Sequence, residues 1–218
     1  KETRALAEER AKHPFDDIET APLDYLPKAW SEPYGTLQDT VYEVYDLQAI
    51  RIDGAAEHPT ALVQSAAMAS VPPPVPSYRP VLPKTLVRDG LLSAPQLESV
   101  IYAGNAHETH LKGLFKRGEI EGQLIAAAEG DEGAFRLRKG WFLGDGTGCG
   151  KGRQVAGIIL DNWLQGRRRS VWVSKSDKLI EDARRDWMAL GGRESDIVPL
   201  SKFRQGSDIR LPEGILFV

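Results

Sequence analysis

The sequence predicts an α/β fold in which a parallel sheet is covered by helices, preceded by an irregular N-terminal segment. Strand-like and helix-like stretches alternate from residue 91 to the last residue. A glycine-rich loop separates an apolar run from an amphipathic helix, as in a strand–loop–helix unit. The chain before residue 91 is instead broken by prolines. These observations divide the chain into a leader (1–50), a proline-rich strap with a short helix (51–90) and an α/β part (91–218).

The leader begins with polar residues that predict a short helix over Thr3–Lys12. The alternation through 40–45 predicts one strand. In the second zone, a helical stretch is expected around Leu62–Met68. The proline-dense segment Val71–Pro76 excludes both a helix and a central strand, and predicts an extended strap.

The α/β part opens with a helix that starts at Ser93–Gln96 and carries apolar residues as far as Leu111. A hairpin is expected within Gly113–Arg138. The later elements follow from short apolar runs, from 3.6-residue periodicity and from terminating glycines. They are a strand at Trp141–Leu143, a helix through Val155–Trp163 that ends at Gly166, a strand at Ser170–Ser174, a helix over Asp177–Leu190, and strands at Ile197–Val198 and Ile215–Val218.

Composition excludes several classes of protein. Apolar residues make up 41% of the 218 residues and charged residues 27%, as in ordinary globular proteins. The single cysteine allows no internal disulfide and fits a reducing compartment, so we expect a cytoplasmic protein. No apolar run approaches the roughly 20 residues of a membrane-spanning helix. Because the chain starts at Lys1 inside a helical pattern, we expect a fragment of a longer polypeptide.

Charge is distributed unevenly along the chain. Residues 1–135 carry 12 Lys and Arg against 21 Asp and Glu, a net −9, whereas residues 136–218 carry 16 against 10, a net +6. A basic C-terminal part suits an anionic ligand such as nucleotide phosphates or nucleic acid. A solvated helix face explains the same charges equally well.

The residues that indicate chemistry lie between Gly144 and Gly152, in the string GDGTGCGKG. Glycines allow successive backbone N–H groups to converge on one point, and the following helix directs its positive end there. Lys151 would supply a mobile cation for the β- and γ-phosphates of a nucleotide. A structural turn with a surface lysine would not explain this concentration of glycines, so we predict a phosphate-binding loop.

The loop departs from the usual phosphate-loop pattern at two positions. Asp145 stands where a glycine is usual. Gly152 stands where a Ser or Thr hydroxyl normally ligates Mg²⁺. The metal ligands are therefore unknown from the sequence, with Thr147, water or an acidic motif beyond this chain as candidates.

The string Gly144–Gly157 resembles motif I of the strawberry notch family, a group of superfamily-two helicase-like ATPases that also carry Gly after the lysine. The resemblance extends over roughly residues 55–218. It includes the segments His58–Thr60, Val63–Val71, Gly90–Glu98, Val173–Ser176 and Asp182–Asp186. Large bacterial, plasmid and phage members are similar to this sequence and often lie beside DNA-methyltransferase modules.

This resemblance implies the N-terminal part of a first RecA-like P-loop domain in an ATPase that depends on nucleic acid, and we expect that nucleic acid to be DNA. It implies ATP and Mg²⁺ as cofactors and Lys151 as the catalytic cation. The implied nucleotide-binding residues are Gln96, Thr147, Gly148, Cys149, Gly150, Lys151, Gly152 and Arg153. An acidic motif and a second domain would lie downstream, so we expect this part alone to bind nucleotide poorly and not to hydrolyse it.

Two further candidates keep a structural alternative. Gln96 resembles the glutamine that reads adenine in superfamily two, but Ser93-x-x-Gln96 is equally a capping box. Tyr78 suits a packed tyrosine better than a base-stacking one.

Ser174, Lys175 and Ser176 resemble motif Ia, which contacts nucleic acid, although Ser176 also suits a helix N-cap. Two other functions remain open at this point. One is a nucleotide-responsive interaction module without turnover, and the other is a structural segment of a large phage or plasmid protein.

Overall fold

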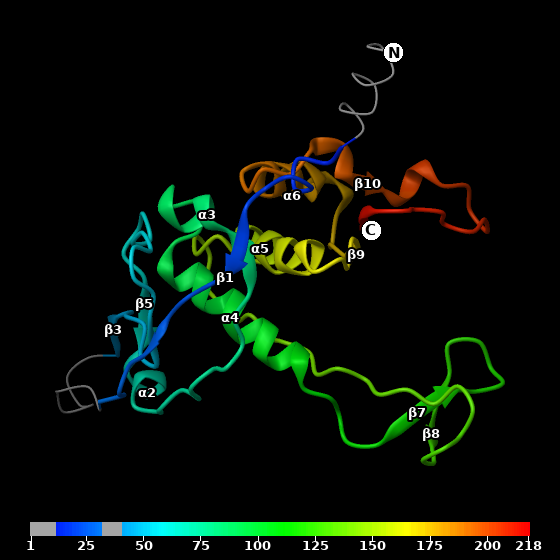
Figure 1. The fold of residues 1–218 in the computed structure, drawn as a ribbon, viewed down its shortest axis with the longest axis horizontal. Coiled ribbons are helices and arrows are strands. Elements are labelled where there is room, and N and C mark those ends of the chain that lie inside the picture. The colour runs from blue at the N-terminus through cyan, green and yellow to red at the C-terminus, as the bar shows by residue number, and fades with distance from the viewer. Residues whose placement is uncertain (1–11, 32–40) are drawn as a thin grey trace, which may run out of the picture.

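The computed structural model describes residues 12–31 and 41–218 (Figure 1). The helix predicted at Thr3–Lys12 therefore lies almost entirely outside the described residues. Before residue 91 the elements are short: β1 (Thr20–Pro22), β2 (Leu26–Pro27), β3 (Tyr42–Val44), β4 (Ile50–Arg51), β5 (Val63–Ser65), α2 (Ala66–Ala69), β6 (Val81–Pro83) and α3 (Lys84–Arg88). The later ones are α4 (Ala94–Glu108), β7 (Leu114–Arg117), β8 (Leu124–Ala127), α5 (Lys151–Leu164), β9 (Arg169–Trp172), α6 (Ile180–Met188), β10 (Ile197–Pro199) and β11 (Gly214–Phe217).

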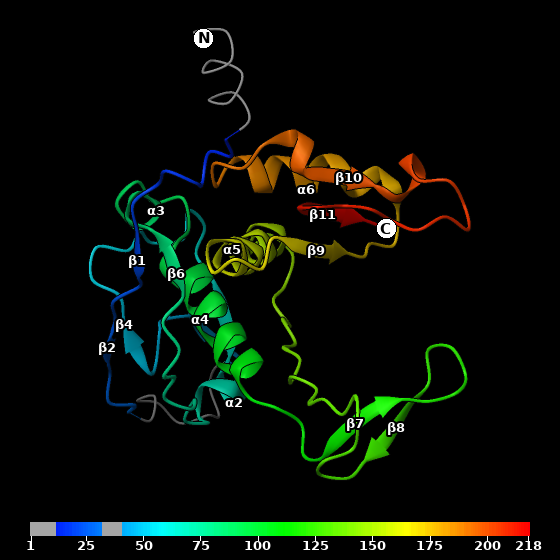
Figure 2. The same cartoon turned by 45° about the vertical axis from the view of Figure 1, so that its right-hand side comes forward.

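The predicted parallel sheet is present and has the strand order β10-β11-β9. The last strand along the chain, β11, lies in the middle, and all four of its residues are buried. Helix α6 covers one face of the sheet (Figure 2). A short 3₁₀ turn at Asp177–Leu179 precedes this helix, which ends just before Gly191, as expected from the sequence. The α/β fold class is thus confirmed.

Helix α5 forms the centre of the molecule, because it contacts both α4 and α6. Gly157 allows α4 to approach closely, since a Cβ at this position would lie 3.0 Å from atoms of both Leu92 and Val100. Further along, Asp161 is buried and accepts hydrogen bonds from the Tyr78 hydroxyl (2.5 Å) and the Val81 amide (2.7 Å). The position of α5, and hence of the loop that precedes it, is fixed on several sides.

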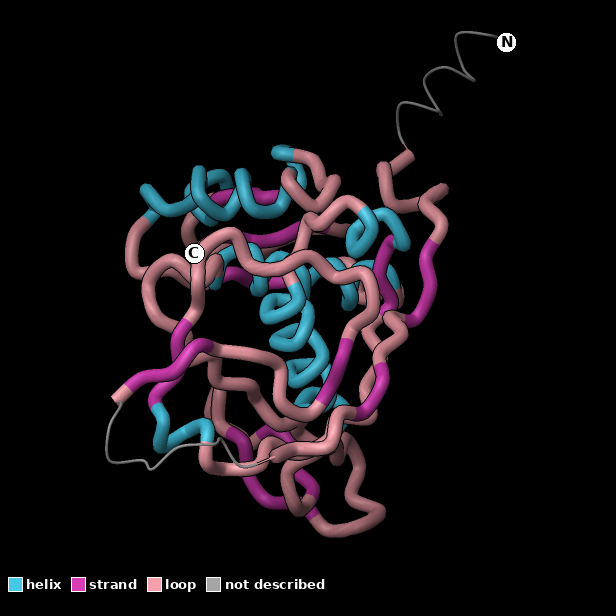
Figure 3. Tube along the Cα trace, turned by 90° about the vertical axis from the view of Figure 1, so that its left-hand side faces the viewer, coloured by secondary structure: helices cyan, strands magenta, loops and turns pink. Residues whose placement is uncertain are grey.

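The described part of the leader is mostly irregular, as the Cα trace in Figure 3 shows, and the core cluster contains residues of the leader together with those of the α/β part. Strand β1 pairs with β6 in antiparallel fashion. Phe15, Leu23 and Tyr25 join the cluster that contains Trp163 and Trp187. The predicted strap at Val71–Pro76 contains no helix or strand, and Tyr102 donates a hydrogen bond to the Pro74 carbonyl (2.8 Å). The division into a leader, strap and α/β domain stays a prediction.

The strand predicted at Trp141–Leu143 is absent, so this prediction is wrong. A strand requires a paired neighbour, and none of the described residues forms a ladder with this segment. Trp141 instead stacks on Tyr102, with ring centroids 6.0 Å apart and planes 9° apart. Phe142 is 88% exposed.

Two helix predictions were also wrong in their bounds. Val63–Ser65 is the strand β5, which pairs with the expected strand β3, and only the four residues of α2 are helical there. The β-branched Val63 and the cross-strand partners explain this outcome. Helix α4 ends at Glu108, and Leu111 lies beyond it and is exposed.

The predicted hairpin is confirmed as β7 and β8, which pair in antiparallel fashion. It lies at the end of an arm that extends away from the rest of the molecule (Figures 1 and 2).

Among the described helices, none is both long and apolar enough to cross a membrane.

Candidate phosphate-binding loop

The loop before α5 has a backbone conformation that depends on glycine at two positions. Gly148 has φ of 94° and Gly150 has φ of 73°, and both values lie in the left-handed region that other residues rarely adopt. Gly150 is also the N-cap of α5, so the helix begins directly at the turn. The turn therefore lies at the positive end of α5, and a helix N-terminus of this kind favours bound anions.

Lys151 is the first residue of α5, and its side chain reaches back over the loop. Its ammonium group donates to the carbonyl oxygens of Asp145 (2.9 Å) and Gly146 (2.8 Å). These are uncharged acceptors in an exposed loop. Phosphate oxygens are stronger, charged acceptors for the same ammonium group, so they can replace the carbonyl groups.

The buried carboxamides of Gln154 and Gln96 bond to the loop and hold it in place. Gln154, which is 1% exposed, donates to the Asp145 carboxylate (2.9 Å) and to the Cys149 carbonyl (3.1 Å). Gln96 donates to the same Cys149 carbonyl (3.2 Å). The sequence analysis did not select Gln154 as a site residue. Gln154 lies one helical turn after Lys151, on the same side of α5, and this spacing could have identified it as a site residue.

Gln96 makes the capping contact that the sequence left open. Its side-chain oxygen accepts from the Ser93 amide at 3.0 Å, while its nitrogen contacts the loop. A Cβ at residue 150 would collide with this nitrogen, so Gln96 lies directly against the turn. Recognition of adenine by Gln96 stays a prediction.

Tyr78 has the packing role that the sequence favoured. It is buried, and its hydroxyl bonds to Asp161 and to Gln165 (2.7 Å). Burial, followed by the hydrogen bond to Asp161, raises the pKa of Tyr78 to about 12.

The remaining predicted loop residues fall into two groups. Thr147 is exposed in the loop, and Cys149, a free thiol, is half-buried and contributes its carbonyl group to both carboxamides. Gly152 and Arg153 face α6 instead. The Arg153 guanidinium donates to the Leu91 carbonyl (3.2 Å) and lies 3.4 Å from the Asp186 carboxylate. Their predicted contact with nucleotide is untested.

A buried carboxyl group on α4 contributes to the electrostatics of the loop. The pKa of Glu98 is raised to about 7, chiefly by burial and also by the negative charges of Asp46 and Asp145. The hydroxyl of Tyr45 donates to Glu98 and opposes this shift. The same burial and the Glu98 charge raise the pKa of Tyr45.

The residues predicted to contact nucleic acid lie where β9 ends. Ser174 donates its amide to the Val218 carbonyl (2.7 Å), and Ser176 accepts from the Lys178 amide as the N-cap of the 3₁₀ turn. The cap alternative for Ser176 is therefore confirmed. Lys175 is exposed, and it forms no ion pair with any other residue that the structure describes.

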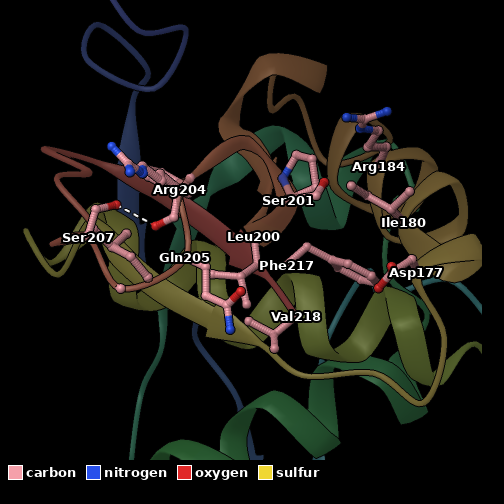
Figure 4. Close-up of a pocket in the computed structure, with 14 residues that line it drawn as sticks. Asp177, Ile180, Arg184, Leu200, Ser201, Arg204, Gln205, Ser207, Phe217 and Val218 are labelled. Atoms are coloured by element: carbon pink, nitrogen blue, oxygen red, sulfur yellow. Dashed lines mark hydrogen bonds between the residues drawn. The ribbon is translucent and has the colours of Figure 1, made fainter.

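A pocket of about 760 Å³ lies beside this segment, at the carboxyl ends of the parallel strands β10 and β11. Phe217 of the central strand and Val218, which follows it, line this pocket. Figure 4 shows Arg184 on α6 and Arg204 on the loop after β10 at opposite ends of the pocket. Ligands of open α/β sheets commonly bind at this edge.

Comparison with known proteins decides the family. The model of the family described as "P-loop containing NTP hydrolase pore-1" matches residues 57–218, and this range includes the whole glycine-rich loop. The chain belongs to this family of P-loop NTP hydrolases. Its curated relatives are strawberry notch proteins, so the resemblance seen in the sequence is confirmed.

The relatives include animal strawberry notch proteins and one plant protein. The chain is 36% identical to "Protein strawberry notch homolog 1" of Gallus gallus over 157 residues, which are 72% of this chain and 11% of the relative. It is 36% identical to "Protein strawberry notch" of Drosophila melanogaster over 165 residues, or 75% of this chain and 9% of the relative. For "Protein FORGETTER 1" of Arabidopsis thaliana the identity is 33% over 165 residues, which are 74% of this chain and 11% of the relative.

The chain thus spans about a tenth of the length of these relatives. No solved structure matches it.

Proposed function

We propose that this chain is the ATP-binding part of a nucleic-acid-dependent, helicase-like ATPase or translocase. The observation that carries the proposal is the turn at Gly148 and Gly150, which leads into α5 with Lys151 folded back over it. The backbone N–H groups of Thr147–Gly152 would bind the β- and γ-phosphates, and Lys151 would neutralise their charge.

Mg²⁺ is proposed as the second cofactor, and the donor groups around the loop suit it. Asp145 and Thr147 provide a carboxylate and a hydroxyl group in the exposed part of the loop. Mg²⁺ favours oxygen ligands from one or two carboxylates together with phosphate, and it supplies charge that draws electrons from the transferring phosphoryl group. In this proposal Lys151 is the catalytic cation, and turnover needs acidic groups and an arginine from beyond this chain.

Nucleic acid, most simply DNA, is proposed to run across the carboxyl ends of the sheet. An exposed Lys175 and the two arginines of the adjacent pocket support this path, because phosphate contacts are made largely by such side chains. A methyltransferase module in the same system and a cytoplasmic location are proposed on the sequence resemblance and the single cysteine.

Titration of a fluorescent ATP analogue tests nucleotide binding by the 218-residue chain. We expect weak, saturable binding that Lys151→Ala abolishes while the melting temperature is unchanged, because the Lys151 ammonium group bonds to two carbonyls of an exposed loop. Lys112→Ala, which removes an exposed lysine of the arm, is the matched control and should bind normally. Binding that survives Lys151→Ala would refute the assignment of the loop.

A further inference from the structure

Gly152 is not required by the conformation of the backbone. It is absent from the glycines with positive φ, so any residue could adopt its backbone angles. Glycine is needed here because there is no room for a side chain. A Cβ at residue 152 would collide with Oδ2 of Asp186 and would lie 3.3 Å from its Cγ. The Asp186 carboxylate therefore fills the volume that a side chain at residue 152 would occupy.

Asp186 comes from α6, a different element from the loop. Its side chain is 14% exposed. Its Oδ1 lies 3.4 Å from Nε of Arg153, and its Oδ2 lies 4.0 Å from Arg185, beyond hydrogen-bonding distance. No hydrogen bond to this carboxylate is found among the residues that the structure describes. Oδ2, the oxygen that faces residue 152, thus has unused capacity as an acceptor.

The position that Asp186 fills has a known chemical role in phosphate-binding loops. A Ser or Thr hydroxyl at the residue after the lysine ligates Mg²⁺. Gly152 has no such group, but an oxygen of Asp186 lies within the same volume. Carboxylates are preferred ligands of Mg²⁺, which binds to one or two of them together with phosphate oxygens.

We propose that Asp186 supplies the oxygen that replaces the missing hydroxyl group, so that this chain holds the Mg²⁺ of a bound nucleoside triphosphate from α6. The proposal rests on the proposed function, because it assumes that phosphates bind over the loop. It also explains why a glycine follows Lys151: the small residue leaves room for the carboxylate.

A purely structural role makes a different prediction. If Asp186 serves only as the ion-pair partner of Arg153, its neutralisation lowers stability and leaves metal binding unchanged. The experiment must therefore separate the effect of Mg²⁺ on nucleotide binding from the stability of the fold.

The affinity for a fluorescent ATP analogue is measured with Mg²⁺ and with a chelator, for the unmodified chain and for Asp186→Asn. We expect the gain in affinity from Mg²⁺ to fall roughly 10- to 100-fold in Asp186→Asn, as for lost groups at other metal sites. The affinity in chelator should be unchanged, because Lys151 and the loop amides remain. Asp182→Asn, which removes an exposed carboxylate one turn earlier on α6, is the matched control.

A second variant tests the replacement directly. In the double variant Gly152→Ser with Asp186→Ala, the carboxylate is removed and a hydroxyl is placed in the vacated space, so the Mg²⁺ effect should return. Electron paramagnetic resonance of Mn²⁺ with ATP provides a readout independent of the fluorescent group. A full Mg²⁺ effect in Asp186→Asn would overturn the proposal. Failure of the unmodified chain to bind nucleotide even in chelator would overturn the proposed function and this inference together.

Discussion

Glu98 is a buried carboxyl group whose ionised form the fold disfavours. Its pKa rises from an ordinary 4.5 to about 7, chiefly through burial. Between these pH values the folded chain binds more protons at Glu98 than the unfolded chain does, so stability falls as pH rises through this window. The difference corresponds to roughly 3 kcal/mol of unfolding free energy that is lost above pH 7.

Glu98→Gln should remove this dependence, since the amide carries no charge and its oxygen still accepts from Tyr45. We expect the variant to match the unmodified chain near pH 4 and to melt at a higher temperature at pH 8. Thermal melts across pH 4–8 measure this, with the exposed Glu108→Gln at the end of the same helix as control. A constant difference between the two chains at all pH values would contradict the assignment.

At this scale the sequence predicted what depends on local backbone geometry. Gly148 and Gly150 were selected as turn residues because only glycine favours their conformation, and their φ values agree. The contacts of Gln154 and Asp186 with the loop were not predicted, because they join residues whose proximity depends on helix packing. The unusual Gly152 was the only local sign of Asp186.

The elements show a similar division between local and long-range signals. Helices α5 and α6 and strands β9, β10 and β11 were predicted, since apolar periodicity and terminating glycines are local properties. Trp141–Leu143 has the composition of a strand, but no ladder partner among the described residues. The composition of a segment can predict an extended backbone, but it does not specify which strand the segment pairs with.

Hydrogen exchange distinguishes these two extended segments. The β11 amides lie in ladders with both neighbouring strands, so we expect strong protection at Ile215–Phe217. The amides of Trp141–Leu143 should exchange with little protection, because they lack ladder bonds. Mass spectrometry of peptides from the two segments measures the difference. Equal protection would show that 141–143 is a paired strand in solution.

At the scale of the whole molecule, the described leader is joined to the α/β part by a buried polar contact. His13 lies 3.0 Å from the Asp196 carboxylate, which also accepts from the Trp187 indole (2.7 Å). The His13 ring packs against Phe15 and Trp163. The leader therefore belongs to the core that positions α5 and the loop.

His13→Ala should destabilise the entire chain, because it leaves a buried carboxylate with one partner fewer and opens a gap beside Trp163. We expect a loss of roughly 2–4 kcal/mol of unfolding free energy in a single cooperative transition. Chemical denaturation followed by tryptophan fluorescence measures this, with the exposed His110→Ala as control. Two separate transitions, or no change in stability, would show that the leader folds independently.

The central claim is that the main-chain amides around Gly148 and Gly150 bind the phosphates of a nucleotide. Two-dimensional ¹⁵N NMR of the chain during titration with ATP and Mg²⁺ tests it most directly. The account predicts that the largest shifts occur at the amides of Gly146–Gly152 and disappear in Lys151→Ala. Unchanged loop amides, with shifts confined to other surfaces, would contradict it.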